Sequence, residues 1–250
     1  MILTVNNISK YFTSSRGLLK SKSVVIRALE GVSFQVGEFE TLGLVGESGS
    51  GKTTLAKIIL KLMLPTSGEL VFDPGYIRDF RKDVQIIFQN PYNSLNPRMR
   101  ILDILAEPLL IHKITGRRDV KDEASGLLAM VGLSGDILKR YPIEFSGGQR
   151  QRICIARALA TRPKFIILDE PISSLDLTVQ AQMLDLLAQL KERFKLTYIF
   201  ISHNLAVIKH IADNVIVMKE GVIVEKASCE KIFNSPDHPY TKALLQAAKG

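Results

Sequence analysis

The sequence predicts an α/β fold in which helices cover a largely parallel sheet. Two apolar runs, Phe165–Leu168 and Tyr198–Ile201, have the length and composition of buried parallel strands. The amphipathic helix predicted at Val179–Phe194 lies between them. In addition, helical patterns replace strand signals from Pro91 to Arg162, which indicates a helical subdomain inserted into the α/β core.

The first part of the chain is expected to form an antiparallel β part at the N-terminal side. Short strands are predicted in this part of the chain at Ile2–Ile8, Ala28–Val36 and Glu40–Val45. A polar, basic stretch from Thr13 to Ser23 separates the first two and is expected to be an exposed hairpin or loop.

The remaining elements follow from helical spacing and short apolar runs. A helix is predicted at Thr54–Met63, and the helices of the inserted subdomain, 91–162, at Ile101–Ile111, Asp119–Val131 and Gly147–Ala160. Short strands return at Asn214–Met218 and Val222–Lys226, before a helical tail over 227–250. We expect residues 1–250 to form a single domain that contains the inserted subdomain.

The composition is that of a globular protein, with 250 residues and 46% hydrophobic residues. Uncharged apolar runs of about 18 residues are missing, and so is a secretion signal, which predicts a protein of the cytoplasm. Cys154 and Cys229 are expected to be reduced thiols rather than metal ligands. The net charge of +8 is scattered and tryptophan is absent, so we expect no nucleic-acid partner.

The segment Gly46–Thr53 matches the phosphate-binding P-loop pattern between a predicted strand and a predicted helix. Glycines let backbone N–H groups turn inward around phosphate oxygens, and the helix N-terminus adds partial positive charge. Lys52 supplies a charge for the outer phosphates, and the Thr53 hydroxyl is suited to ligate Mg²⁺. The pattern alone is also typical of kinases and GTPases. The predicted nucleotide-binding residues are Gly46, Glu47, Ser48, Gly49, Ser50, Gly51, Lys52, Thr53 and Thr54.

Two acids end the apolar strand at Phe165–Leu168. Asp169 is suited to hold Mg²⁺, directly or through water. Glu170 comes one residue later and can polarise an attacking water as a general base. The alternative, two carboxylates that cap the turn before Pro171, carries less weight because a P-loop lies upstream.

His203 and Gln89 also follow short apolar strands. In parallel sheets the ligand-binding edge lies at the C-terminal ends of the strands. We therefore interpret His203 as a sensor of the γ-phosphate that also positions the attacking water. The Gln89 amide, after Val84–Phe88, can touch both Mg²⁺ and that water.

The segment Phe145–Arg152 contains the residues that identify a family. It resembles the signature motif of ABC-type ATPases, with Phe145 where that motif usually has leucine. Ser146, Gly147 and Gly148, followed by Gln149, form a second potential anion-binding turn at a helix N-terminus. In the family this turn closes on the ATP held by the partner's P-loop, so the resemblance implies a dimer with two ATP molecules between the subunits.

Other segments follow the order of the same family. The segment from Ser173 to Asp176 resembles the loop that crosses the dimer interface, and Tyr11 resembles the aromatic residue that stacks on adenine. The resemblance covers essentially the whole chain. It implies an ABC ATPase fold: a P-loop NTPase core, an N-terminal antiparallel β subdomain and an inserted α-helical subdomain.

A narrower resemblance concerns three further segments. Residues 81–98, the tail from His238 to Leu245 and the basic insert around Arg16–Lys20 are similar to the ATPases of oligopeptide, dipeptide and nickel importers. The insert resembles the second ATPase of dipeptide systems. Many members of that group carry a cysteine-rich tail that binds an iron–sulfur cluster, which the lone late Cys229 does not support.

The resemblance implies an ATPase that powers an importer from the cytoplasmic face of a membrane. Its expected partners are a second ATPase subunit (a sister chain or an identical one), two transmembrane permease subunits and, indirectly, an extracytoplasmic substrate-binding protein. Peptides are the expected cargo, and nickel or metal chelates are the alternative. A soluble ABC protein without a transport role and an ATP sensor that does not hydrolyse are the rival classes.

Overall fold

The computed structural model describes residues 1–15, 23–89 and 94–247. By their internal contacts these residues form two units, one of residues 1–77 and 197–250 and one of residues 78–196. In the parts that are described, no helix is long and apolar enough to cross a membrane. Both predicted thiols are free, and burial raises the pKa of Cys154 to about 11.

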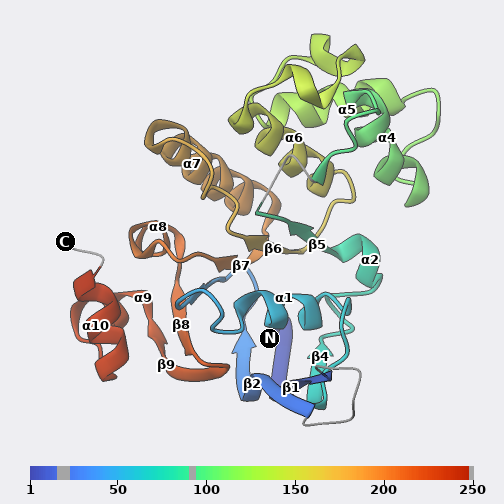
Figure 1. Cartoon of the computed structure of the whole chain (residues 1–250). Helices are drawn as coiled ribbons and strands as arrows, with labels where there is room; N and C mark the ends of the chain where they lie inside the picture. Colours follow the sequence, from blue (N-terminus) through green and yellow to red (C-terminus); the bar gives the residue numbers. More distant parts are fainter. Residues whose placement is uncertain (16–22, 90–93, 248–250) are drawn as a thin grey trace. The chain divides into compact units, whose positions relative to one another are not determined.

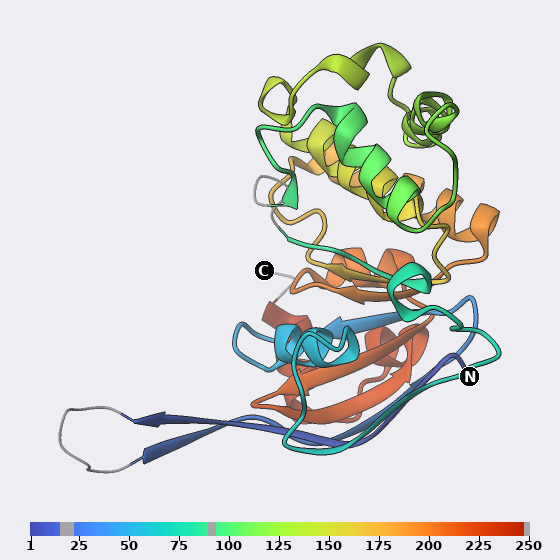
Figure 2. The same cartoon turned by 90° about the vertical axis from the view of Figure 1, so that its right-hand side faces the viewer.

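The first unit contains a three-stranded antiparallel sheet in the order β2-β1-β4, visible in Figure 1. Its strands are β1 (Leu3–Ser15), β2 (Ser23–Val36) and β4 (Ser67–Phe72). β1 and β2 stay paired from Leu3 with Val36 to Ser15 with Ser23, and Figure 2 shows the long ribbon that they form. The exposed hairpin or loop predicted from Thr13 to Ser23 therefore begins and ends in paired strands, and its residues 16–22 lie outside the described part of the chain.

The same unit also holds the strands in the order β7-β3-β8-β9. They are β3 (Thr41–Val45), β7 (Thr197–Ile201), β8 (Asn214–Lys219) and β9 (Val222–Ser228). β3 lies parallel to both β7 and β8, and every residue of β3 and β7 is buried. This burial explains why both strands are continuous apolar runs.

Four helices complete this unit: α1 (Lys52–Ile59), α8 (Leu205–Ile211), α9 (Cys229–Asn234) and α10 (Pro239–Ala247). α8 packs closely on β3, since a Cβ added at Gly43 would lie 2.8 Å from Ile208 Cγ2. The predicted helix at Thr54–Met63 begins two residues earlier and ends at Ile59.

The second unit contains a pair of parallel strands, β5 (Val84–Ile87) and β6 (Phe165–Asp169). Its helices are α2 (Phe80–Asp83), α4 (Ile101–Ile111), α5 (Val120–Met130), α6 (Gly147–Leu159) and α7 (Leu177–Phe194), with 3₁₀ turns at Gly135–Lys139 and Pro142–Glu144. α4, α5 and α6 pack against one another, as Figure 1 shows. The helices predicted between 94 and 162 all form.

The α/β fold with an antiparallel sheet and a parallel-rich sheet is thereby confirmed. β4, α2 and α8 were not predicted. β4 begins Ser67-Gly68-Glu69 and is mostly exposed, so it lacks the apolar run of a buried strand. α2 and α8 are only four and seven residues long, too short for helical spacing to be recognised.

Candidate functional site

The P-loop connects β3 to α1 and contains glycines with positive φ, a backbone conformation that other residues rarely adopt. Gly46 has φ 149° and Gly51 has φ 104°. A Cβ at Gly46 would lie 2.2 Å from the Met218 carbonyl oxygen, and one at Gly51 would lie 2.6 Å from that of Ala28. These two positions therefore need glycine for both conformation and space.

Lys52 lies inside the curve of this loop and is only 7% exposed. Its Nζ donates to the carbonyl oxygens of Gly46 and Glu47 at 2.8 Å and to Ser50 Oγ at 3.2 Å. These contacts hold the positively charged ammonium group within the loop.

The first turn of α1 supplies further groups that suit an anion. Its N-cap is Gly51, which has no side chain to occupy the free N–H groups of that turn. Thr53 is exposed and Thr54 half-buried within the same turn. Backbone N–H groups, a partial helix charge and the Lys52 ammonium thus occur together, which is the chemistry that binds phosphate.

Two more predicted residues belong to the first unit. His203 lies two residues after the end of β7 and is exposed. Tyr11 lies in β1, where its backbone N–H donates to Thr66 Oγ1 at 3.0 Å and the Arg27 guanidinium carbon lies 6.0 Å from its ring centroid. Tyr11 is half-buried, so part of its ring remains accessible.

In the second unit, Gln89 and Glu170 are brought together although 81 residues separate them. Gln89 Nε2 donates to Glu170 Oε2 at 2.9 Å. The contact arises because β5 and β6 run parallel and adjacent, and both side chains come just after the C-terminal ends of these strands. Gln89 and Glu170 were each predicted because they follow the end of a strand. The structure shows that the two side chains are in contact.

Glu170 has a left-handed backbone, with φ 47°, which is uncommon outside glycine. Its carbonyl oxygen accepts from the Ser173 Oγ at 3.1 Å and from the Ser173 N–H at 3.3 Å. Asp169, the last residue of β6, is 8% exposed. Because the chain turns sharply here, the two consecutive side chains differ in exposure. Asp169 is buried, whereas Glu170 remains partly accessible.

The predicted signature segment starts α6 through a capping box. Ser146 Oγ accepts from the Gln149 N–H at 3.3 Å, and Gln149 Oε1 accepts from the Ser146 N–H at 3.1 Å. Asp176 caps α7 through a single hydrogen bond, in which its Oδ1 accepts from the Val179 N–H at 2.9 Å.

These two helix starts pack closely together. A Cβ at Gly148 would lie 2.8 Å from Val179 Cγ1, and one at Gly147 would lie 3.6 Å from Leu175 Cδ2. Leu177, next to Asp176, is 81% exposed. Two segments predicted separately as partner-facing therefore form one surface of the second unit.

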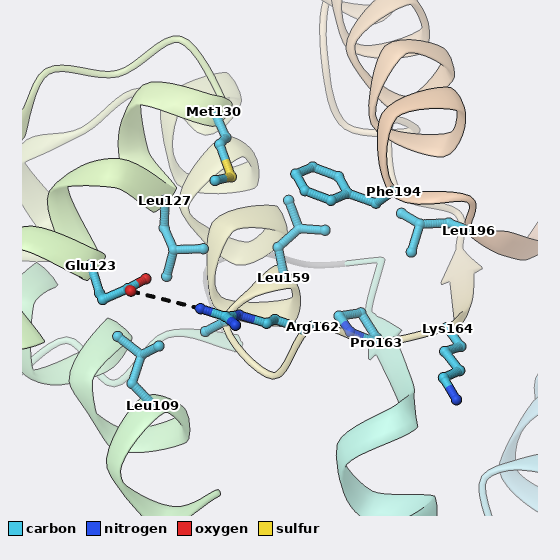
Figure 3. A pocket seen from close by; sticks show the side chains of 11 residues that line it. Leu109, Glu123, Leu127, Met130, Leu159, Arg162, Pro163, Lys164, Phe194 and Leu196 are labelled. Atoms are coloured by element: carbon cyan, nitrogen blue, oxygen red, sulfur yellow. Dashed lines mark ion pairs between the residues drawn. The ribbon is translucent and has the colours of Figure 1, made fainter. Parts of the chain in front are cut away.

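A pocket of about 300 Å³ lies elsewhere in this unit, and Figure 3 shows its lining. Its walls are mainly apolar, and Arg162 pairs with Glu123 at 3.7 Å. The predicted site residues that are described do not line it. The lining residues are Leu109, Glu123, Leu127, Met130, Leu159, Ala160, Arg162, Pro163, Lys164, Phe194 and Leu196.

One contact of the P-loop was not predicted from the sequence. The Glu47 N–H donates to the hydroxyl of Tyr240, from α10, at 3.3 Å. A tyrosine 193 residues away along the chain carries no spacing signal that links it to the loop.

Comparison with known proteins identifies the family of the chain. The family model described as "ABC transporter" matches residues 29–173. The chain is 46% identical over 254 residues to the di/tripeptide transport ATP-binding protein DppF of Pseudomonas aeruginosa, covering 98% of this chain and 78% of that protein. It is 47% identical over 255 residues to the oligopeptide transport ATP-binding protein OppF of Streptococcus mutans serotype c, covering 98% and 81%.

A solved structure has the same fold. The dimeric post-hydrolysis state of the ATP-binding cassette MJ0796, bound to ADP and Pi, matches with a TM-score of 0.77 and 27% identity, covering 91% of this chain and 99% of that one. The family model spans more than half of the chain, and the two relatives match almost all of it. The chain therefore belongs to the ABC transporter family, as an ATP-binding and ATP-hydrolysing subunit.

Proposed function

We propose that this ATPase subunit powers the import of dipeptides or oligopeptides across a membrane, from the cytoplasmic face. The observation that carries the proposal is the near full-length similarity, at 46% and 47% identity, to proteins named for di/tripeptide and oligopeptide transport. Import of nickel or metal chelates is the alternative that the narrower resemblance of residues 81–98 leaves open.

The P-loop would hold the ATP phosphates, and Tyr11 would stack on adenine. Lys52, now bonded to loop oxygens, would exchange these neutral partners for the charged β- and γ-phosphates. Ser48, Gly49 and the first turn of α1 would add N–H donors. His203 would contact the γ-phosphate.

The residues proposed for Mg²⁺ are Thr53, Gln89 and Asp169. Their hydroxyl, amide and carboxylate oxygens are the hard donors that Mg²⁺ prefers, so the donor set fits the ion. When bound, the ion would neutralise charge that develops on the transferred phosphoryl group.

Glu170 would act as the general base of hydrolysis. Its carboxylate would accept a proton from the attacking water, and the Gln89 amide at 2.9 Å would hold that carboxylate in one orientation. The water oxygen would bond to the γ-phosphorus as the bond to the β-phosphate oxygen breaks, giving ADP and phosphate. The presence of this hydrogen-bonded pair favours a hydrolysing subunit over a non-catalytic ATP sensor.

The surface formed by the starts of α6 and α7 would face a second ATPase subunit. Ser146, Gly147, Gly148 and Gln149 would close on the ATP of that partner, with Asp176 beside them. The exposed Leu177 supports this assignment, because a large apolar side chain beside two helix N-termini is suited to burial by a partner.

A groove in the second unit is suited to a short helix of a permease subunit. It has a volume of about 270 Å³ and is lined by residues after and within β5, by α4 and by α6. Phe88 and Ile111 line it and are 41% and 67% exposed, which gives an apolar surface to cover. The lining residues are Gln85, Ile86, Phe88, Glu107, Pro108, Ile111, His112, Arg157 and Ala158.

The test is uptake into vesicles by the transporter assembled from this chain, its partner ATPase and two permease subunits. We expect ATP-dependent uptake of labelled dipeptides or oligopeptides, which an excess of unlabelled peptide suppresses. Uptake of nickel chelates instead would favour the alternative cargo. ATP hydrolysis that no permease subunit stimulates would favour a protein without a transport role.

A further inference from the structure

The C-terminal tail contacts the phosphate-binding loop through one side chain. The Tyr240 hydroxyl, in the first turn of α10, accepts a hydrogen bond from the Glu47 N–H at 3.3 Å. Burial raises the pKa of Tyr240 above its usual range; the hydrogen bond from the Glu47 N–H opposes this rise, and the negative charge of the Glu47 carboxylate adds to it. The hydroxyl therefore keeps its proton and meets Glu47 at both backbone and side chain.

The tyrosine is itself held firmly. Its backbone N–H donates to His238 Nδ1 at 3.1 Å, and Lys219 Nζ lies 5.1 Å from its ring centroid. The Glu225 carboxylate, on β9, accepts from the N–H groups of Asp237 at 2.7 Å and His238 at 3.1 Å. The start of α10 is thus fixed to the sheet that also carries the loop.

The loop needs such support because of its composition. Gly46, Gly49 and Gly51 all have positive φ, with 149°, 81° and 104°. Glycines lose more conformational freedom on ordering than other residues, so this loop is costly to order. A second contact acts at the same place, since the Gly221 N–H donates to the Ser50 carbonyl oxygen at 3.1 Å.

A small cleft of about 80 Å³ marks where the loop, the β8–β9 turn and the tail converge. It is lined by Glu47, Ser48, Gly49, Ser50, Lys219, Glu220 and Tyr240. The loop is therefore contacted from the β8–β9 turn and from α10, while Lys52 contacts it from within.

We propose that Tyr240 is a positioning residue for ATP, which acts through the Glu47 N–H to keep the phosphate-binding loop ordered before the nucleotide binds. The proposal rests on the function above, in which this loop holds the phosphates. A loop that is already ordered loses less conformational entropy when ATP binds, so the tail contact increases affinity. The chemical step does not involve the hydroxyl, so the turnover rate at saturation is independent of it.

The test is Tyr240→Phe in the full chain, which removes the hydroxyl and keeps the ring over Lys219. One neutral hydrogen bond corresponds to about two- to tenfold in affinity, and we expect ATP to bind more weakly by that factor. In the assembled transporter, KM for ATP rises by a similar factor while kcat is unchanged. Hydrogen exchange in a peptide covering residues 46–51 becomes faster.

The matched control is Tyr76→Phe. The Tyr76 hydroxyl also bonds to a glutamate, Glu38, in the same unit, and its ring packs edge-to-face on Phe39. Its removal is expected to leave ATP affinity and the exchange of residues 46–51 unchanged.

The possible outcomes distinguish the function proposed for the phosphate-binding loop from the role proposed for Tyr240. Wild-type chain that does not bind ATP refutes the function proposed for the loop. Wild-type binding together with unchanged affinity and unchanged exchange in Tyr240→Phe overturns the role of Tyr240 alone. A fall in kcat with unchanged KM also overturns it, because that result places the hydroxyl in the chemical step.

Discussion

At the scale of single residues, Lys52 stabilises the P-loop without ATP, and in the proposed function it would also bind ATP. Its ammonium group contacts three oxygens of the loop that surrounds it, at 2.8 to 3.2 Å. These contacts keep the loop curved around the position that we propose for the phosphates. In the function proposed above, the same ammonium group would bind the anionic phosphates of ATP.

Lys52→Ala is therefore expected to abolish or greatly weaken ATP binding while the protein stays folded. A nucleotide titration and a melting curve measure the two effects. Lys57→Ala is the matched control, because Lys57 is an exposed lysine on the same helix and lies one turn further on. Unchanged affinity in Lys52→Ala would refute the phosphate cradle.

Glu170→Gln is expected to keep ATP binding but to reduce turnover by roughly 100-fold or more, as loss of a general base does. The amide has the same shape and still meets Gln89, so the turn after β6 remains. Phosphate release by the assembled transporter is the measurement, with the exposed Glu192→Gln as control. The variant should also accumulate as a closed dimer with ATP, and near-normal turnover would contradict the assignment.

Lys52 and Glu170 could be predicted from the sequence. Lys52 lies within a compact motif, and Glu170 follows the C-terminal end of a strand. Gln89 and Glu170 needed only the rule that parallel strands present their C-terminal ends at one edge. The left-handed turn at Glu170 and the contact from Tyr240 could not be predicted in this way. Both depend on atoms that are brought together by tertiary structure rather than by spacing along the chain.

At the scale of elements, the capped starts of α6 and α7 bring two separate segments of the chain side by side. Gly148 allows the close approach to Val179, and Ser146 and Asp176 cap the helices that carry these loops. The sequence predicted an anion-binding turn at Ser146 and an interface loop ending at Asp176, but neither the Asp176 cap nor the contact between the two segments. Helical spacing likewise predicted α4, α5, α6 and α7, whereas the short α2 and α8 and the exposed β4 lack the periodicity that prediction requires.

The attachment of α10 to β9 is expected to depend on pH. Although burial alone would raise it, the neighbouring Thr241 hydroxyl and hydrogen bonds from the N–H groups of Asp237 and His238 hold the pKa of Glu225 below its ordinary value of 4.5. A carboxylate with a lowered folded-state pKa contributes stability that is present above its ordinary pKa and is lost as the pH falls through the folded-state value. The contribution of Glu225 is therefore complete at pH 7 and declines below about pH 4.5.

Glu225→Gln should consequently lower the melting temperature at pH 7 by about 2 °C or more, and by less at pH 4. Melting curves of wild type and variant at the two pH values provide the measurement. Glu69→Gln, an exposed residue of β4, is the control and should show no such difference. A difference that grows as the pH falls would contradict the role of Glu225.

At the scale of the whole molecule, the proposed site is shared between subunits. The P-loop of this chain would bind one ATP molecule. The surface formed by the starts of α6 and α7 would contact the other ATP, which is held by the partner's P-loop. The isolated chain is therefore expected to be mostly monomeric and a poor ATPase, since a small interface rarely holds without ligand between the partners.

Ser146→Arg is expected to leave ATP binding by this chain intact and to abolish hydrolysis at the P-loop of its partner. The measurement is nucleotide binding and phosphate release at each site, after mixing mutant chain with wild-type partner. Ser228→Arg is the control, because Ser228 caps α9 as Ser146 caps α6. If Ser146→Arg destroyed ATP binding by the isolated chain, the signature would act within its own subunit.

The order of strands along the chain also has a consequence for biosynthesis. β3 (Thr41–Val45) lies between β7 and β8, which are synthesised more than 150 residues later, at Thr197–Ile201 and Asn214–Lys219. Residues 78–196, by contrast, form a unit from one continuous stretch. Because local contacts form sooner than distant ones, this stretch can become compact on the ribosome while the P-loop strand still awaits its neighbours. The nascent P-loop segment, with its apolar strand uncovered, is therefore where we expect a chaperone to bind during synthesis.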